Sequence, residues 1–204
     1  HGVKLIIGAE MTVDDGERLV LLAQGKRGYQ QLCRLITRGR RRSEKGSSVL
    51  LWEEIFAESD DLVALAFRLS DADGGRGSEL KAAFGARLYA AAVRHRSEDE
   101  RPIEAALREQ ATRLAVPIVA VNEVLYHTPA RRRVQDIVTC LRHGVTLPTA
   151  GRHLKPNAEH AIKSTHQFAE LFADDPQAVR RTCAVAERCT FNLGELRYRY
   201  PAEW

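Results

Sequence analysis

The sequence has no long apolar run and no charged leader followed by a hydrophobic segment. The first absence argues against a membrane-spanning helix, and the second gives no indication of secretion. We therefore expect a cytoplasmic protein that has no membrane partner. The chain begins with His1 instead of methionine, and its first residues, HGVKLIIGAE, resemble the interior of a fold. We expect a fragment of a longer protein.

Cysteine and aromatic residues are also few. The four cysteines form no CxxC pair and have no zinc-finger spacing, so neither kind of site is indicated. Buried, reduced thiols are the favoured interpretation, and disulfides remain the alternative. Aromatic residues make up 6% of the chain and rarely alternate with basic ones, so the stacking surface typical of single-strand binding is not indicated.

What the chain does contain is the composition of a globular protein, with 44% hydrophobic residues and an even mixture of charges. Its 204 residues are enough to bury a core, as one domain or as one domain with an appendage. The net charge of +4 is compatible with binding to nucleic acid, but many enzymes share it.

Strand-like and helical segments alternate over the first two thirds of the chain. Short apolar runs predict buried strands at residues 3–7, 62–67, 88–93 and 117–121. A hairpin is expected to turn at Asp15-Gly16, and a loop is expected at 70–79. Beyond residue 146 only helices are expected, at 164–172 and 175–189. The pattern predicts a parallel α/β fold followed by a helical extension.

The helix expected at residues 130–142 shows a clear apolar periodicity and a glycine, Gly144, where its C-cap would lie. We expect its apolar side chains to point inward. They are Val134, Ile137, Val138 and Leu141.

Potential ligands follow several of the predicted strands: Glu10, His95, Glu123 and the nearby His127. Carboxylates and imidazoles at one rim of a sheet are what a hydrolytic metal centre requires, because they hold cations that activate water. The alternative is that these side chains cap loops or pair with arginines.

Four stretches together resemble the PHP (polymerase and histidinol phosphatase) domain of bacterial error-prone DNA polymerases, relatives of the DNA polymerase III alpha subunit. They are KLIIGAE, LVLLAQGKRGYQQLCRLITRGRRRSEKG, NEVLYHTPARRRVQDIVTCLRHG and AERCTFNLGELRYRYP. The resemblance implies an incomplete PHP-type (β/α)7 barrel at residues 1–145, without its N-terminal strands. Residues 146–204 would be a helical linker toward the polymerase palm domain.

The resemblance also bears on the metal ligands. Glu10 matches the glutamate of a Gly-x-Glu motif, and the family's Asp-x-His motif falls on Glu123-Val124-Leu125. Leucine has no lone pair with which to bind a cation, so one metal ligand of the family is missing at Leu125. The resemblance therefore implies a degenerate site, at which binding of zinc or manganese is doubtful. His127, two residues further on, and His95 remain candidate ligands.

Two clusters of arginines stand out in the sequence. The second cluster lies at the start of a predicted helix, where cations are unfavourable, so its arginines are expected to have an anionic partner. That partner is either the phosphate backbone of DNA or acids of the protein, such as Glu123 and Asp136. The clusters are Arg38, Arg40, Arg41 and Arg42, and Arg131, Arg132 and Arg133.

For the parent protein the resemblance implies damage-tolerant DNA synthesis in translesion synthesis and DNA repair. Magnesium and deoxynucleoside triphosphates would bind the following palm domain, and a sliding clamp and accessory translesion proteins are further expected partners. This segment would carry no catalytic residue of its own and would be inactive alone. The alternative is an active metal-dependent phosphoesterase or 3'-5' exonuclease of the PHP superfamily.

Overall fold

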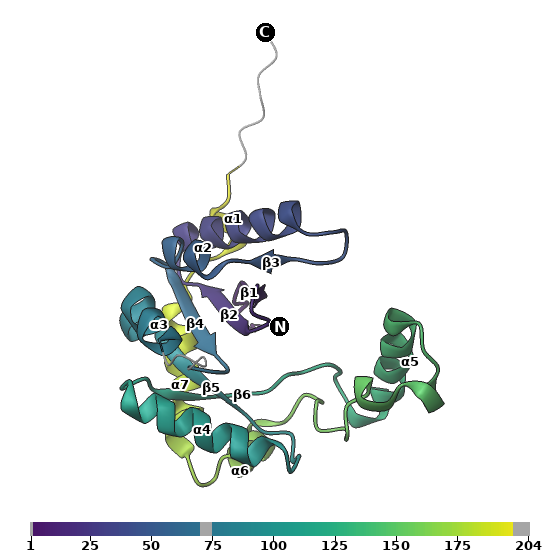
Figure 1. The fold of residues 1–204 in the computed structure, drawn as a ribbon. Coiled ribbons are helices and arrows are strands. Elements are labelled where there is room, and N and C mark those ends of the chain that lie inside the picture. Colours follow the sequence, from purple (N-terminus) through teal and green to yellow (C-terminus); the bar gives the residue numbers. More distant parts are fainter. Residues whose placement is uncertain (1, 70–74, 198–204) are drawn as a thin grey trace.

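A hairpin begins the sheet in the computed structural model, which describes residues 2–69 and 75–197 (Figure 1). β1 (Gly8–Val13) and β2 (Arg18–Ala23) pair antiparallel, and Gly16 occupies the turn with φ +84°, a conformation that favours glycine. The predicted hairpin is thus confirmed.

The sheet has six strands in the order β3-β1-β2-β4-β5-β6. β4, β5 and β6 run parallel, as does the short pair of β1 with β3, whereas β2 runs antiparallel to both β1 and β4. The remaining strands are β3 (Val49–Leu50), β4 (Leu62–Ala66), β5 (Leu88–Val93) and β6 (Ile118–Val121).

Three of the four predicted strands are confirmed, at 62–67, 88–93 and 117–121, within a residue at their ends. The strand predicted at residues 3–7 is wrong: these residues lie outside the sheet, and Val3 and Leu5 are exposed. Pairing begins only at Gly8, which lies opposite Leu22 near the end of β2. Glu10 therefore lies within β1 and not after a strand.

The expected parallel arrangement holds for β4, β5 and β6, and the predicted hairpin places β2 antiparallel to both β1 and β4. Within the described residues the sheet is open, with β3 and β6 as its edges, so a closed barrel is not seen there.

Four helices cover one face of the sheet (Figure 1). They pack apolar side chains, including Leu35, Ile55 and Phe84, against the strands, and all three of these side chains are fully buried. These helices are α1 (Lys26–Arg42), α2 (Trp52–Ala57), α3 (Arg76–Phe84) and α4 (Glu100–Arg113).

The start of α3 overlaps the loop predicted at 70–79, so that prediction is wrong for 76–79. Helix propensity there is weak, and the packing of Leu80 against the core outweighs the polar, glycine-containing sequence. Residues 70–74 lie outside the described part.

α6 (Thr165–Leu171) and α7 (Pro176–Arg188) begin where their caps predicted. Ser164 Oγ accepts a hydrogen bond from the Gln167 N–H, and Asp175 Oδ1 accepts one from the Ala178 N–H. α7 lies against β6, and its Val185 packs into the core of the opposite face beside Tyr89 and Val119. The two predicted C-terminal helices are therefore confirmed, while a separate domain from residue 146 stays a prediction.

An ion-pair network joins α4 to the turn between α6 and α7. Arg94, directly after β5, forms two short hydrogen bonds with Glu104 and pairs with Asp174. Its guanidinium also lies 4.5 Å from the centre of the Phe172 ring. Arg108 bridges Glu104 and Asp175, both at 2.7 Å. These interactions fix the position of the C-terminal helices relative to the end of β5.

α5 (Arg132–His143) stands apart from the sheet on two long connections (Figure 1). Gly144 caps it with φ +64°, as predicted. The expectation that its apolar side chains point inward is wrong, because Val134, Ile137, Val138 and Leu141 are exposed, Leu141 by 77%. Periodicity marks one apolar face of a helix, but it does not say whether the described chain supplies anything to cover that face.

All four cysteines are free. Cys140 and Cys189 are buried, as expected, whereas Cys33 and Cys183 are exposed, contrary to the expectation of buried thiols. Among the described residues no helix combines the length and the hydropathy that crossing a membrane requires. The sequence also led us to expect that the tyrosines at 198 and 200 anchor the tail against a following domain, and both lie outside the described residues.

Candidate metal centre at the ends of the parallel strands

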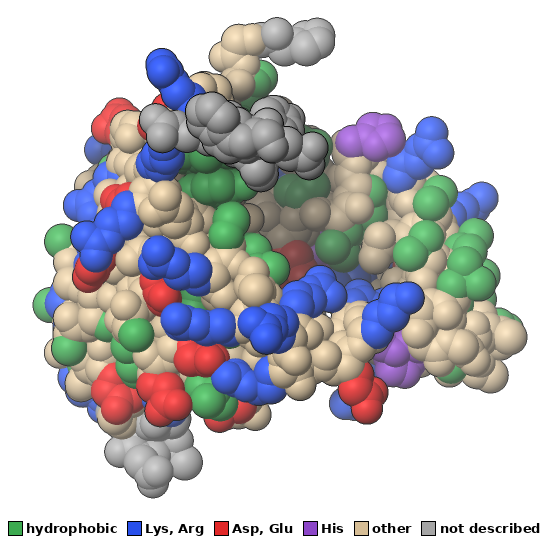
Figure 2. Space-filling view, turned by 90° about the horizontal axis from the view of Figure 1, so that it is seen from above, with side chains coloured by type: hydrophobic (Ala, Val, Ile, Leu, Met, Phe, Trp, Pro, Cys, Tyr) green, Lys and Arg blue, Asp and Glu red, His purple; other side chains and the backbone are tan. Residues whose placement is uncertain are grey.

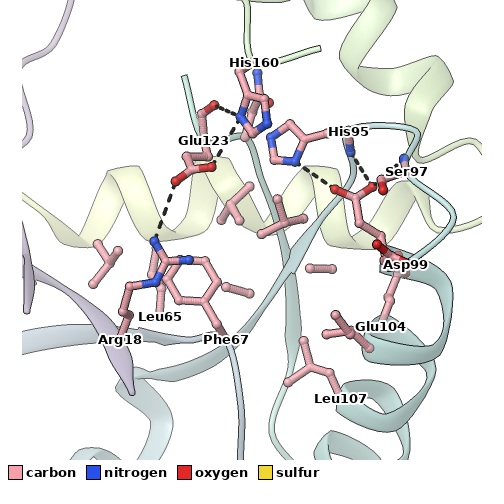
Figure 3. A pocket seen from close by; sticks show the side chains of 18 of the residues that line it. Arg18, Leu65, Phe67, His95, Ser97, Asp99, Glu104, Leu107, Glu123 and His160 are labelled. Carbon is pink, nitrogen blue, oxygen red and sulfur yellow. Dashed lines mark hydrogen bonds and ion pairs between the residues drawn. The ribbon is translucent and has the colours of Figure 1, made fainter. Parts of the chain in front are cut away.

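A pocket of about 660 Å³ lies where β4, β5 and β6 end (Figure 3). Side chains such as Leu65, Phe67 and Leu107 make its apolar wall, and charged groups and imidazoles approach it from three segments of the chain. The location agrees with the expectation for parallel strands, whose carboxyl ends meet at one edge.

His95 lies two residues after β5, and its side chain is only 6% exposed. Glu100, in the first turn of α4, accepts a hydrogen bond from the His95 backbone N–H at 2.7 Å and contacts His95 Nδ1 at 2.9 Å. This carboxylate favours a proton on Nδ1, which leaves the lone pair of Nε2 available. His95 Nε2 is buried and has no hydrogen-bond partner.

His160 reaches the same place from a distant segment. A parallel bridge pairs Tyr126 with Ala161, and the Leu125 N–H donates to the His160 carbonyl at 2.9 Å. Asn157 adds a second link, because its Nδ2 donates to the carbonyl of His95 at 2.6 Å. These bonds bring the buried His160 beside the ends of β5 and β6.

The imidazoles of His95 and His160 lie face to face, with ring centroids 3.7 Å apart and planes inclined by 21° (Figure 3). Nδ1 of His160 lies 3.0 Å from the carbonyl oxygen of Glu123, which can only accept, so this bond also places the proton on Nδ1. Burial, and next the neighbouring His95, lower the pKa of His160 below its usual value. In both rings Nδ1 makes the hydrogen bond, which leaves Nε2 as the remaining ring nitrogen.

Glu123 completes the group and is surrounded by cationic side chains. Its Oε2 accepts a hydrogen bond from Lys155 Nζ at 2.8 Å, and its Oε1 lies 3.6 Å from Arg18 Nη1. Burial opposes ionisation of Glu123, but the hydrogen bond from Lys155 and the charges nearby outweigh it and lower the pKa of the carboxyl. Glu123 is therefore ionised at neutral pH.

Arg18 joins Glu123 to Glu10, because the same Nη1 atom lies 3.2 Å from Glu10 Oε1. Its guanidinium also lies 5.5 Å from the centre of the Phe67 ring. Glu10 and Glu123, which could otherwise bind a metal ion, thus share one arginine. The positive charge of its guanidinium neutralises both carboxylates, as a metal ion would.

The donor atoms of His95, Glu123 and His160 lie within 4.8 Å of one another, the only such group of three found among the described residues. Two imidazoles and one carboxylate are ligand types that suit zinc, and the buried Nε2 of His95 has no hydrogen-bond partner among the described residues. His95, Glu123 and His160 are therefore the candidate ligands for one ion. Bound there, a divalent cation would supply a Lewis acid and a fixed positive charge.

The predicted ligands divide into three groups. His95 and Glu123 come together, and Glu10 reaches them only through Arg18. His127 is exposed and lies outside the group of converging donors. His160 was missed by the sequence analysis, since its position depends on the bridge of its segment to Tyr126. The Leu125 position, where a histidine was expected, contributes a backbone hydrogen bond instead.

The arginine clusters divide as well. In the first, Arg38 pairs with Glu58, and Arg42 binds both carboxylate oxygens of Glu54. In the second, Arg132 lies 3.6 Å from Asp136 and donates to the carbonyl of Lys155 at 2.7 Å.

Four arginines of the two clusters are exposed and make no side-chain hydrogen bond or ion pair among the described residues: Arg40, Arg41, Arg131 and Arg133. Figure 2 shows Lys and Arg side chains along the rim of a hollow on one face of the molecule.

Known proteins resemble this chain over its whole length. Residues 1–116 match the family described as PHP domain. Error-prone DNA polymerase 1 of Agrobacterium fabrum is 38% identical over 100% of this chain and 19% of its own length. An error-prone DNA polymerase of Pseudomonas fluorescens is 41% identical over 99% of this chain, again 19% of its own length. The chain therefore spans about a fifth of the relatives that it matches.

Proposed function

The chain belongs to the PHP-domain family, and on that premise we propose that it is the PHP part of an error-prone DNA polymerase, a DNA-directed nucleotidyltransferase. The observation that carries this proposal is the match of nearly every residue of the chain to proteins of that name, at 38–41% identity. The match continues past residue 116 through the helices α5, α6 and α7, so it includes segments beyond the PHP family match.

Within the parent protein this part would serve as architecture. A hydrolytic centre with two or three ions needs ligands for each of them. Here Arg18 already neutralises Glu10 and Glu123, and Lys155 holds the second oxygen of Glu123. Leu125 occupies the position at which the family resemblance places a histidine. These features favour a degenerate site over the alternative, an active phosphoesterase or 3'-5' exonuclease.

The chemistry of the parent would lie in the palm domain expected after this segment. Magnesium bound there would hold deoxynucleoside triphosphates, and the enzyme would extend primers past damaged template in translesion synthesis and DNA repair. A sliding clamp and accessory translesion proteins would be its further partners.

Primer extension tests the proposal. The 204-residue chain and a parent protein that contains it are assayed side by side with magnesium, labelled primer and template. We expect the parent to incorporate nucleotides, the chain alone to incorporate none, and neither to remove nucleotides from the 3' end. Template-dependent extension by the chain alone would refute the proposal. Manganese-dependent removal of 3' nucleotides that disappears in Glu123→Gln would favour the exonuclease.

A second candidate role is contact with the DNA backbone, and it is favoured by the four arginines that lack an acidic partner in the described structure. Guanidinium groups contact phosphates without reading the sequence, and each such contact adds to the salt dependence of binding. We propose Arg40, Arg41, Arg131 and Arg133 for this role. The arginines paired with Glu58 and Glu54 are less available.

Binding to a duplex oligonucleotide, measured at several salt concentrations in the parent protein, tests this second role. Replacing Arg131 and Arg133 by Ala should weaken binding and lower the salt slope by about 2, because two phosphates would no longer be neutralised by a guanidinium. The control is Arg38→Ala, which removes an arginine already paired with Glu58. Equal effects of the two variants, or no effect of the first, would count against the role.

A further inference from the structure

We propose that α5 binds an acidic amphipathic helix of a separate protein, through a surface that we call the α5 face. This interaction goes beyond the polymerase activity, and a binding measurement tests it without primer extension. It can therefore be absent while the proposed function holds, and the reverse is also true. The α5 face consists of an apolar row, Val134, Ile137, Val138 and Leu141, and of the two arginines beside it, Arg133 and Arg142.

The apolar row has the spacing that one helix presents to another. Positions 134, 137, 138 and 141 follow the i, i+3, i+4, i+7 pattern, which lines up along one side of a helix. Each of the four side chains is at least 50% exposed in the described structure. Figure 2 shows hydrophobic side chains gathered at the right of the view, on the part of the molecule that α5 forms in Figure 1, with Lys and Arg side chains near them. A second helix with the same pattern can pack its side chains between those of the row.

The opposite side of α5 holds the helix in place. There Cys140 is buried, and the imidazoles of His143 and His153 stack with their centroids 4.1 Å apart. A partner therefore meets a helix that is already formed, so binding does not have to order it. The elements that α5 packs against are the short turns η2 (Pro129–Arg131), η3 (Leu147–Thr149) and η4 (Gly151–His153).

The surroundings of the apolar row are basic. Residues 128–158 contain six arginines and lysines and one acid, Asp136, although the net charge of the whole chain is only +4. Asp136 is already paired, because it lies 3.6 Å from Arg132. Helical geometry places Arg133 and Arg142 on the two sides of the row, and neither makes a side-chain hydrogen bond or ion pair among the described residues. Carboxylates beside the apolar row of a partner helix would pair with these two arginines.

The same charges argue against a second copy of this chain as the occupant. Two copies that paired through α5 about a two-fold axis would bring identical surfaces together. Arg133 and Arg142 of each copy would then approach cations of the other, and such like-charge contacts oppose association. A partner with acidic side chains meets attraction at the same positions.

DNA and membranes each match only a part of the α5 face. Phosphates can accept hydrogen bonds from Arg133, which is also proposed to contact the DNA backbone, but they leave the apolar row without a partner. Helices that lie in a lipid surface usually insert bulky side chains such as Trp, Phe and Leu. α5 has no aromatic residue, and three of the four residues in its apolar row are β-branched. An acidic helix supplies both the apolar contact and the negative charge.

The probe for the experiment is a synthetic, fluorescently labelled peptide. It forms a helix with leucines at the i, i+3, i+4 and i+7 positions and glutamates on both sides of them. Fluorescence anisotropy follows its binding to the full 204-residue chain and to a parent protein that contains the chain. We expect both proteins to bind the peptide saturably, and salt to weaken the binding. A peptide with lysine in place of each glutamate should bind at least about 10-fold more weakly, because like charges would then face one another.

Variants of the chain locate the binding on the α5 face. Leu141→Gln should weaken binding of the acidic peptide about 10-fold, because it removes one apolar contact from the complex. Arg133→Glu combined with Arg142→Glu should weaken it at least about 10-fold and remove most of its salt dependence. The matched controls are Ile162→Gln and Arg101→Glu, which make the same changes at exposed positions outside α5. Each control should change the affinity by less than about 2-fold.

Every other occupant has a result that would overturn the proposal. Failure of the acidic peptide to bind, or equal binding of the basic one, would show that the α5 face does not select an acidic helix. Binding to the chain but not to the parent would show that the parent covers the face itself. Self-association that Leu141→Gln abolishes, measured by sedimentation, would assign the face to a second copy. Tighter binding to duplex DNA, or to vesicles of phosphatidylserine and phosphatidylcholine, that Leu141→Gln weakens would assign the face to that ligand.

Discussion

Gly28 is joined to Asp61 by a hydrogen bond that helps to fix the start of α1. The Gly28 N–H donates to Asp61 Oδ2 at 2.8 Å, and the same oxygen accepts from the Gly25 N–H at 3.1 Å. A Cβ atom on Gly28 would lie 2.1 Å from the carbonyl oxygen of Asp61. The carboxylate can cap the helix only because residue 28 has no side chain.

Gly28→Ala should therefore lower the free energy of unfolding by about 2–3 kcal/mol, the upper part of the range for overpacking, because backbone must move to make room. Urea denaturation measures it. Gly75→Ala is the control, since a Cβ there meets nothing within 4 Å and its φ is negative. A loss below about 0.5 kcal/mol in Gly28→Ala would show that α1 starts differently.

Arg94→Ala should lower the free energy of unfolding by about 3–5 kcal/mol, as expected when one partner of a largely buried ion pair is removed. The guanidinium holds Glu104 and Asp174 together and is 18% exposed. The comparison is Arg27→Ala, which breaks an exposed pair with Asp60 and should cost about 0–1 kcal/mol. Similar losses for the two variants would mean that the ion pairs of Arg94 contribute no more to the free energy of unfolding than an exposed surface pair does.

Stability should fall in acid, and Glu54 should account for part of the fall. The hydrogen bond from Arg42 lowers the pKa of Glu54 from 4.5 to about 2. Between these values the unfolded chain binds a proton that the folded chain does not, so the stabilisation is complete above pH 4.5 and is lost as the pH falls toward 2.

The check on Glu54 is the urea midpoint at about pH 6 and about pH 3, in the wild type and in Glu54→Gln. The variant keeps a side chain that can accept from the Leu51 N–H but cannot titrate. Its midpoint should change less between the two pH values than that of the wild type. An equal change in both proteins would assign the acid sensitivity to other carboxylates.

Leu141→Gln should change the free energy of unfolding by less than about 0.5 kcal/mol, because this leucine is 77% exposed. Phe172→Ala, at a fully buried position, should cost about 3–5 kcal/mol. Thermal or urea unfolding of both variants separates the two positions. A large loss in Leu141→Gln would show that the apolar face of α5 is covered within this chain.

Local patterns predicted the elements whose causes are local. The apolar run at 88–93 is β5, and Ser164 and Asp175 begin helices because each side-chain oxygen accepts a backbone N–H of its own first turn. Such signals need only the neighbouring residues.

Features that depend on distant partners were not predictable in the same way. His160 joins the candidate centre through a bridge between Tyr126 and Ala161, and no spacing in the sequence marks that pairing. The apolar residues 3–7 have the composition of a strand, but β2 ends at Ala23, whose N–H donates to the Ile7 carbonyl, and residues 3–6 lie beyond that end. Arg18 lies between the carboxylates of Glu10 and Glu123 because the hairpin pairs Glu10 with Val20, which is two residues after Arg18 in β2.

The docking of α7 on β6 also sets an order for folding during synthesis. β5 and β6 leave the ribosome well before residues 176–188, the segment that includes Arg181, whose guanidinium donates to the Ile118 carbonyl at 2.8 Å. Until α7 has been made, the side chains of Tyr89 and Val119 are exposed to water on the side that Val185 later covers. The nascent chain thus carries an uncovered apolar surface until α7 has been translated, and a stalled ribosome would prolong that state.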